Sequence, residues 1–311
     1  MTSLLIVSPH LDDAVLSCAG AIREHVRRGD QVIVATVFTQ GHDHAQRRAE
    51  DLRAVASLGA IALHLGLLDA PDRLGCARTH RALVEEAVVV EADVAWVQGV
   101  LDAAIRRVKP SHVWGPLGVG GHIDHRVVHA ALSGHASGTG GTPGAVLYED
   151  RPYAFLAGAV RRRLLDLGLP VRAAPDSGAT ITRDLVRSPD PAIVRDGLQS
   201  LPHLRSLLTD EDGGARARTW LSSNICAFAP EQDTEPLSDV TGVVPHVTCH
   251  DAETAEAAAR AICMYESQIA GLFGKPARVA SALRAAALAL APATAPSPPH
   301  AERRFAIGRL R

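Results

Sequence analysis

The chain has 311 residues, of which 47% are hydrophobic and 21% charged, as in an ordinary folded protein large enough for a sizeable core. Its formal net charge of -2 gives no electrostatic reason to expect nucleic acid or an anionic membrane as a partner. No apolar run reaches the roughly 18–20 residues of a transmembrane helix, and no signal peptide precedes Leu4. Five widely spaced cysteines without a Cys-x-x-Cys pair favour reduced thiols, so we expect a cytoplasmic protein.

The first 115 residues alternate between two apolar patterns. Continuous apolar runs predict buried strands at residues 4–7, 31–38, 60–67 and 111–114, and helical spacing predicts helices at residues 15–26, 47–58 and 84–108. This alternation predicts an α/β fold, a Rossmann-like three-layer α/β/α arrangement with a mostly parallel sheet. Right-handed crossovers would bring the carboxyl ends of the strands to one edge, where open α/β sheets bind their ligands.

The second half of the chain is less regular. We expect a strand at 145–149, loops and short helices over 170–212, and a long helix at 252–272. A single domain is therefore expected over residues 1–284. The Ala/Pro-rich C-terminal segment 285–311 has the composition of a partly extended connector.

A cluster of polar residues ends the first predicted strand, in the stretch Ser8-Pro9-His10-Leu11-Asp12-Asp13. The helical pattern starts directly afterwards, so a histidine and two carboxylates share one strand-to-helix turn. A single Asp at such a place is most often a helix N-cap, and Asp12 alone would indicate no chemistry.

A second cluster, Gly120-Gly121-His122-Ile123-Asp124-His125, follows the fourth predicted strand at the same edge. In each cluster two potential ligands are three positions apart, which places them on one face of a helical turn. Two histidine nitrogens and one carboxylate oxygen with an open position are typical of a hydrolytic Zn²⁺ site. The paired clusters therefore favour a metal-dependent hydrolase.

Other catalytic templates fit less well. The chain has no G-x-G-x-x-G after its first strand, no P-loop and no G-x-S-x-G elbow. His125 and His129 have the spacing of a zincin pair but lack the intervening Glu, so we interpret His129 as structural.

The two clusters resemble the motifs of the PIG-L/LmbE-like family, which are zinc-dependent N-deacetylases of N-acetylglucosamine-type conjugates. Further matches extend the resemblance from Leu4 to about Leu272, at Arg47-Arg48-Ala49-Glu50-Asp51, Tyr148-Glu149-Asp150-x-Pro152-Tyr153 and Tyr265-x-Ser267-Gln268. The chain differs from the family at Leu11 and Ala14, where the first motif often has Pro and Glu. It also has Gly120 where mycothiol-type enzymes have a Tyr.

The resemblance implies a role for each residue of the two clusters. It implies one Zn²⁺ per chain, bound by three ligands, namely His10, Asp13 and His125. Asp12 would be the general base, a protonated His122 would stabilise the oxyanion, and Asp124 would orient a histidine. The zinc ion would polarise the amide carbonyl and lower the pKa of a bound water toward ~7.

Four residues near the same edge are weaker candidates for substrate binding, namely His42, Arg47, Asp69 and Arg73. For the arginines and the histidine, a solvated or structural role is the plain alternative.

The expected function is removal of an N-acetyl or other N-acyl group from a small amino-sugar conjugate or a related secondary metabolite. Two alternatives stay open: a non-catalytic ligand-binding module on the same fold, and a different zinc-dependent amide or ester hydrolase. Asp12 favours an enzyme, because a binding module needs no base beside its metal. The sequence is compatible with a homo-oligomer.

Overall fold

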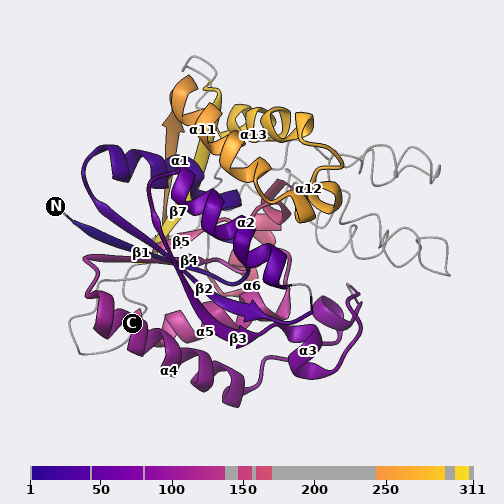
Figure 1. Cartoon of the computed structure of the whole chain (residues 1–311). Coiled ribbons are helices and arrows are strands. Elements are labelled where there is room, and N and C mark those ends of the chain that lie inside the picture. Colours follow the sequence, from indigo (N-terminus) through magenta and orange to yellow (C-terminus); the bar gives the residue numbers. More distant parts are fainter. Residues whose placement is uncertain are drawn as a thin grey trace, which may run out of the picture.

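The computed structural model describes residues 2–42, 44–79, 81–136, 146–155, 159–169, 243–290 and 298–307. Figure 1 shows the helices and strands, which follow one another in this order: β1 (Ser3–Ser8), α1 (Asp13–Arg27), β2 (Gln31–Gln40), α2 (His44–Ser57), β3 (Ile61–Leu68), α3 (Ala70–Leu74), the π-helical turn η1 (Arg81–Glu85), α4 (Glu91–Val108), β4 (His112–Pro116), α5 (Ile123–Ala136), β5 (Val146–Tyr148), the 3-10 turn η2 (Tyr153–Phe155), α6 (Ala159–Asp166), β6 (Val243–His250), α11 (Ala252–Cys263), α12 (Glu266–Leu272), α13 (Ala277–Leu290) and β7 (His300–Ile307).

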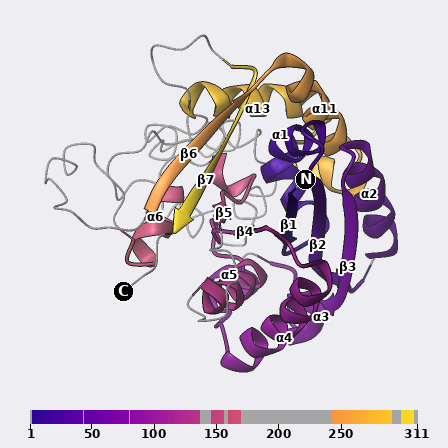
Figure 2. The ribbon, with the colours of Figure 1, turned by 90° about the vertical axis from the view of Figure 1, so that its left-hand side faces the viewer.

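Seven strands form one sheet in the order β3-β2-β1-β4-β5-β7-β6. The first five in this order are parallel, whereas β7 is antiparallel to both β5 and β6. Helices α4 and α5 cover one face, and α1, α2, α11 and α13 cover the other (Figures 1 and 2). The predicted α/β fold with a mostly parallel sheet is therefore confirmed.

Strand β1 lies in the middle of the sheet, with β2 on one side and β4 on the other. Leu4 and Ile6 pack into the core beneath α1, whereas Leu5 and Val7 pack on the opposite face beneath α5. All four side chains are fully buried. A continuous apolar run suits this position, because a central parallel strand has helices on both faces.

The observed elements depart from the predicted ones in the C-terminal half. The helix expected at 252–272 is two helices, α11 and α12, which are separated at Met264–Tyr265. Strand β6 was not expected, since Pro245 interrupts its apolar run; a proline is tolerated there because β6 is the edge strand of the sheet. The loops expected at 170–212 lie outside the described residues.

The C-terminal segment also differs from the expected connector. Helix α13 continues to Leu290, so the expected boundary at residue 284 falls inside a helix. Its Ala-rich end is packed, with Ala286, Ala287 and Leu290 buried, because alanine both favours helix and allows close approach. Strand β7 then lies inside the sheet between β5 and β6.

Helices that combine the length and apolar character needed to cross a membrane are not found in the described part of the chain. Four of the five cysteines fall in this part, and all four are free thiols.

A buried ion pair joins the end of β5 to β7. The Arg303 guanidinium contacts the Glu149 carboxylate, and both side chains are almost completely buried. We predict that Glu149→Ala lowers the free energy of unfolding by about 3–5 kcal/mol, because Arg303 stays buried without this carboxylate. Urea denaturation followed by circular dichroism measures the change.

Glu256→Ala is the matched control, since Glu256 pairs with Arg260 on the surface of α11 and both side chains are more than half exposed. An exposed pair of this kind contributes little to stability. Equal and small losses in the two variants would contradict a stabilising role for the buried pair.

Candidate active site

The turn between β1 and α1 is fixed by its own side chains. The Ser8 hydroxyl accepts a hydrogen bond from the Ala14 N–H at 3.0 Å and donates one to the His10 carbonyl at 2.7 Å. The Asp13 carboxylate accepts from the His10 N–H at 2.8 Å. Asp12 occupies the N-cap position of α1, but its side chain makes no capping hydrogen bond. Its carboxylate is therefore available for another role.

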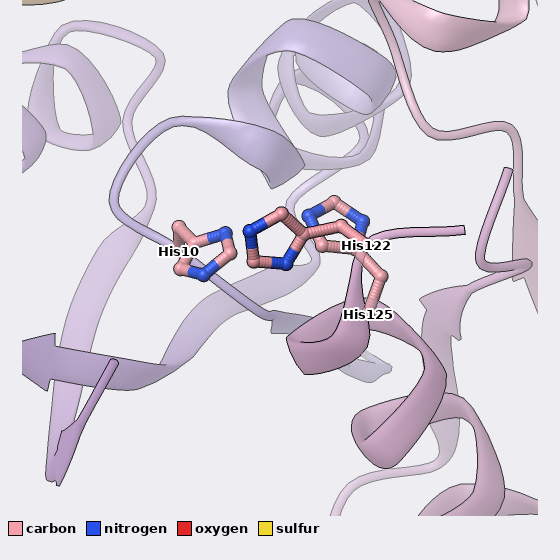
Figure 3. Close-up of side chains that lie close together, drawn as sticks. All are labelled: His10, His122 and His125. Atoms are coloured by element: carbon pink, nitrogen blue, oxygen red, sulfur yellow. The ribbon is translucent and has the colours of Figure 1, made fainter. Parts of the chain in front are cut away.

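The three predicted ligands, His10, Asp13 and His125, converge on one point. Asp13 Oδ2 lies 3.2 Å from His10 Nδ1 and 3.2 Å from His125 Nε2. Figure 3 shows His10 on the turn after β1, with the rings of His122 and His125 reaching toward it from the start of α5. Donor atoms at about 2.0–2.2 Å around one tetrahedral ion have comparable separations. The spacing of the two sequence motifs thus brings two imidazoles and a carboxylate together.

Each of these two histidines is held from behind by a buried carboxylate. His10 Nε2 lies 2.9 Å from Asp124 Oδ2, and His125 Nδ1 lies 2.6 Å from Asp150 Oδ1. Asp150 in turn accepts hydrogen bonds from two backbone N–H groups of the loop after β4, at Gly118 and Val119. These contacts turn the remaining ring nitrogens toward Asp13, in the arrangement common behind metal-binding histidines.

The structure places Asp124 behind His10, where the sequence analysis expected it to orient a histidine. Asp150 belongs to the stretch Tyr148-Glu149-Asp150-x-Pro152-Tyr153, and the sequence pattern alone assigned it no role. The sequence could have indicated Asp150 as a carboxylate that follows a predicted strand at the same edge of the sheet. Its contact with His125, however, depends on β5 lying beside β4.

The local electrostatics favour positive charge at the convergence point. Burial lowers the pKa of His10, but hydrogen bonds to Asp124 and Asp13 outweigh it and raise that pKa to about 9. Burial likewise opposes protonation of His125, yet Asp13 and Asp150 raise its pKa well above the ordinary value. The pKa of Asp13 is well below its usual range despite burial, because of His125 and His10. A cation is the natural occupant of such a site.

Asp12 is a neighbour of this set and not a member of it. Its carboxylate is 6% exposed and lies 3.4 Å from the Arg47 guanidinium. Burial raises the pKa of Asp12 to about 7, and the positive charge of Arg47 opposes the shift. A carboxylate with this affinity for a proton, at the wall of a cavity, has the properties of a general base.

His122 differs from the expected imidazolium. Its Nδ1 accepts a hydrogen bond from the Asp124 N–H at 3.2 Å, so in the neutral ring the proton is on Nε2. Burial first, and the neighbouring His10 second, lower the pKa of His122 to about 3. The ring is thus a neutral hydrogen-bond donor. The donor nitrogens of His10, His122 and His125 also lie within 4.8 Å of one another, so His122 borders the same site.

The expected substrate-binding residues do not share one location. Arg47 and Asp69 line the cavity of about 180 Å³ that contains His10, Asp12 and Asp13. His42 instead lines a neighbouring cavity of about 810 Å³ beside the carboxyl ends of β2 and β3.

Arg73 lines neither of these cavities, and its contacts in the structure are with acidic residues and a ring. Its guanidinium lies 2.9 Å from Asp124 and 3.2 Å from Asp93, and it stacks over the Phe38 ring at 4.8 Å. The fully buried Asp124 carboxylate requires a cationic partner, and Arg73 supplies it.

Tyr153 is a site residue that the sequence analysis did not single out. It lines the small cavity, and its ring meets the His125 ring edge-on, with 6.1 Å between centroids. A Cβ atom on Gly120 would come within 2.3 Å of the Tyr153 ring, and Gly120 has φ +84°. The Tyr153 ring therefore occupies the space beside residue 120, which explains the glycine there.

The chain is similar to known deacetylases over part of its length. Residues 5–135 match the family model described as "PIG-L: GlcNAc-PI de-N-acetylase". The 2'-N-acetylparomamine deacetylase of Streptomyces fradiae is 35% identical over 171 residues, which cover 50% of this chain and 59% of that protein. A 1D-myo-inositol 2-acetamido-2-deoxy-alpha-D-glucopyranoside deacetylase of Mycobacterium sp. (strain KMS) is 31% identical over 156 residues, 40% of this chain and 47% of that protein. The chain thus spans about half the length of these curated relatives.

Solved structures extend the likeness to the whole fold. The A40926 pseudoaglycone deacetylase Dbv21 superposes with a TM-score of 0.60 at 20% identity, covering 100% of this chain and 98% of that one. A deacetylase of the teicoplanin biosynthesis pathway superposes with a TM-score of 0.61 at 18% identity, covering 100% of both chains. These likenesses concern the fold alone. The resemblance seen in the sequence motifs is confirmed over residues 5–135, which match the PIG-L family model.

Proposed function

We propose that this protein is a zinc-dependent N-deacetylase that removes the acetyl group from an N-acetylated amino sugar. The observation that supports the proposal most strongly is that the two adjacent carboxylates make different contacts. Asp13 lies between His10 and His125, whereas Asp12 pairs with Arg47 at the wall of the same cavity. Amide hydrolysis requires a set of metal ligands with a separate base beside it, whereas a binding module needs no such base.

The donor set fits zinc. Two imidazole nitrogens and one carboxylate oxygen are ligands that Zn²⁺ prefers, and three protein ligands leave a position open for catalysis. We assign them to His10, Asp13 and His125, because Asp13 lies 3.2 Å from each histidine nitrogen and each histidine has a carboxylate behind it. When bound, zinc would polarise the amide carbonyl and lower the pKa of water.

The remaining residues of the cavity have roles that follow from their contacts. Asp12 takes a proton from the attacking water and delivers it to the departing amine, which its raised pKa favours. His122 donates from Nε2 to the oxygen of the tetrahedral intermediate, since its Nδ1 already accepts from the Asp124 N–H. Arg47 holds Asp12 in place by an ion pair at 3.4 Å.

The substrate class is inferred from the relatives and from the two cavities. The curated relatives are named for 2'-N-acetylparomamine and for a 2-acetamido-2-deoxyglucopyranoside of myo-inositol. The small cavity holds the proposed catalytic residues, and Arg78 at its wall pairs with Asp72 of the larger cavity at 3.1 Å. We propose that the acetamido sugar lies in the first cavity and that the rest of the conjugate extends toward the second.

The proposal is tested by measuring amine release from a panel of N-acetylglucosamine conjugates, with the metal content of the same preparation determined by mass spectrometry. We expect about one equivalent of zinc at this site and release that is abolished by a chelator and restored by Zn²⁺. Activity that is unchanged after the metal is removed would overturn the proposal. Release of acyl groups from esters but not from amides would favour a different hydrolase.

Substitution of the two adjacent carboxylates should separate their roles. We predict that Asp12→Asn retains zinc but slows turnover by about 10²–10⁴-fold, because the proton acceptor is lost. Asp13→Asn should lose its zinc, and the loss of zinc should abolish its activity. Metal content and amine release are measured on the same samples. Near-normal turnover in Asp12→Asn would show that another group is the base.

The carboxylate behind His125 should control metal affinity. We predict that Asp150→Asn weakens zinc binding by about 10–100-fold, since the ring of His125 loses its anionic partner. Competition with a chromophoric chelator measures the affinity. Asp166→Asn is the control, because Asp166 forms a half-exposed pair with Arg162 on α6. Equal affinity in the two variants would contradict the role given to Asp150.

A further inference from the structure

A second cluster of potential metal ligands lies on the antiparallel strands β6 and β7, outside both cavities described above. His250 on β6 is paired directly with His300 on β7, and Glu302 is two residues further along β7. Cross-strand partners and residues two positions apart share one face of a sheet. The three side chains therefore project together from this face, and their donor atoms lie within 4.8 Å of one another.

The distances within this cluster resemble those within the active site. Glu302 Oε1 lies 2.9 Å from His300 Nε2, and Glu302 Oε2 lies 3.4 Å from His250 Nε2. Ligand atoms at about 2.0–2.2 Å around one tetrahedral zinc ion are separated by roughly 3.2–3.6 Å. Each histidine nitrogen therefore lies near the distance from a Glu302 oxygen that two ligands of one ion would have.

Helix α1 fixes the orientation of the cluster. Glu24 Oε1 lies 2.7 Å from His250 Nδ1, the same carboxylate-behind-imidazole contact that holds the histidines of the active site. The N–H groups of Gly20 and Ala21 donate to the two oxygens of Glu302. A Cβ atom on Gly20 would come within 2.6 Å of the His250 ring, so a glycine is needed where α1 passes over the cluster.

The cluster also contains buried nitrogen atoms without hydrogen-bond partners. The side chains of His250 and His300 are 0% and 1% exposed. Neither His250 Nε2 nor His300 Nδ1 has a hydrogen-bond partner among the described residues. His250 Nε2 nevertheless faces the Glu302 carboxylate. Unsatisfied buried polar atoms are costly, and a cation beside Glu302 would provide the missing partner for His250 Nε2.

We propose that His250, His300 and Glu302 bind a second zinc ion that joins the β6–β7 pair to helix α1. Two imidazoles favour zinc over Mg²⁺ or Ca²⁺, which prefer oxygen ligands. The site is structural: its ligands are completely buried, and the carboxylate beyond the ligand set, Glu24, already holds His250. A base comparable to Asp12 is not found beside it among the described residues.

Zinc content of the full chain tests the proposal. Protein loaded with Zn²⁺ and passed through a desalting column should contain two zinc ions per chain. Asp13→Asn, which removes the proposed catalytic metal, should retain one, His250→Gln should retain one, and the double variant should retain none. His246→Gln is the matched control, since His246 is an exposed histidine on the same strand and should leave the content at two.

The outcomes separate this site from the catalytic one. If the catalytic site bound no metal, the wild-type chain would retain one ion, Asp13→Asn would still retain it, and His250→Gln would lose it. If the cluster instead holds only protons between Glu302 and its histidines, Asp13→Asn would retain none. That result would overturn the second site and leave the first intact.

A further measurement requires no substitution within the cluster and decides the case even if His250→Gln fails to fold. Co²⁺ added to Asp13→Asn should give visible absorption bands of a tetrahedral ion that saturate at one equivalent, and Zn²⁺ should raise its melting temperature. A featureless spectrum together with an unchanged melting temperature would refute the proposal.

Discussion

The active site depends on one constraint: a carboxylate, Asp13, is held 3.2 Å from two imidazoles in a place that water scarcely reaches. Burying such groups is unfavourable unless each charge has a partner. The fold meets this cost with a second layer of carboxylates, Asp124 and Asp150, and these are themselves held by backbone N–H groups. The geometry of the proposed ligands is therefore set by residues outside the proposed ligand set.

These contacts explain why the site lies where it does in the sheet. The chain passes from β1 to β2 on one side and returns to β4 on the other, so the loops after β1 and β4 diverge and leave a crevice. His10 follows β1, and His125 follows β4. Asp124 also accepts from the Ala70 N–H at the start of α3, and Asp150 follows β5. Four strand ends are thus tied to one point, and the crossovers of a parallel sheet make that possible.

This dependence on neighbouring strands marks what the sequence could and could not predict. The strand-to-helix turns with His10, Asp13 and His125 are local patterns, and their convergence follows from a parallel sheet. The roles of Asp150 and Tyr153 require that β5 lie beside β4. The pairing of Arg73 with Asp124 was not foreseen, because a rim arginine and an arginine buried against a carboxylate have the same local sequence. The interior position of β7 comes from pairing with β5 and β6, and its composition does not reveal that.

The active site and the His250–His300–Glu302 cluster orient their histidines in the same way, with different consequences. In both, a carboxylate holds an imidazole from behind: the buried Asp124 and Asp150 in one, and the partly exposed Glu24 in the other. In the first cluster one carboxylate, Asp12, is left over at the wall of a cavity, so the site can move a proton. In the second, the Glu302 carboxylate accepts hydrogen bonds from the backbone of α1 and lies 2.9 Å from His300 Nε2, so it is held in place as a proposed ligand and is not left over as a base. An ion bound there would stabilise the contact between α1 and the β6–β7 pair but would not reach a substrate. The same kind of ligands therefore indicates catalysis at the start of α1 and a structural link near its middle.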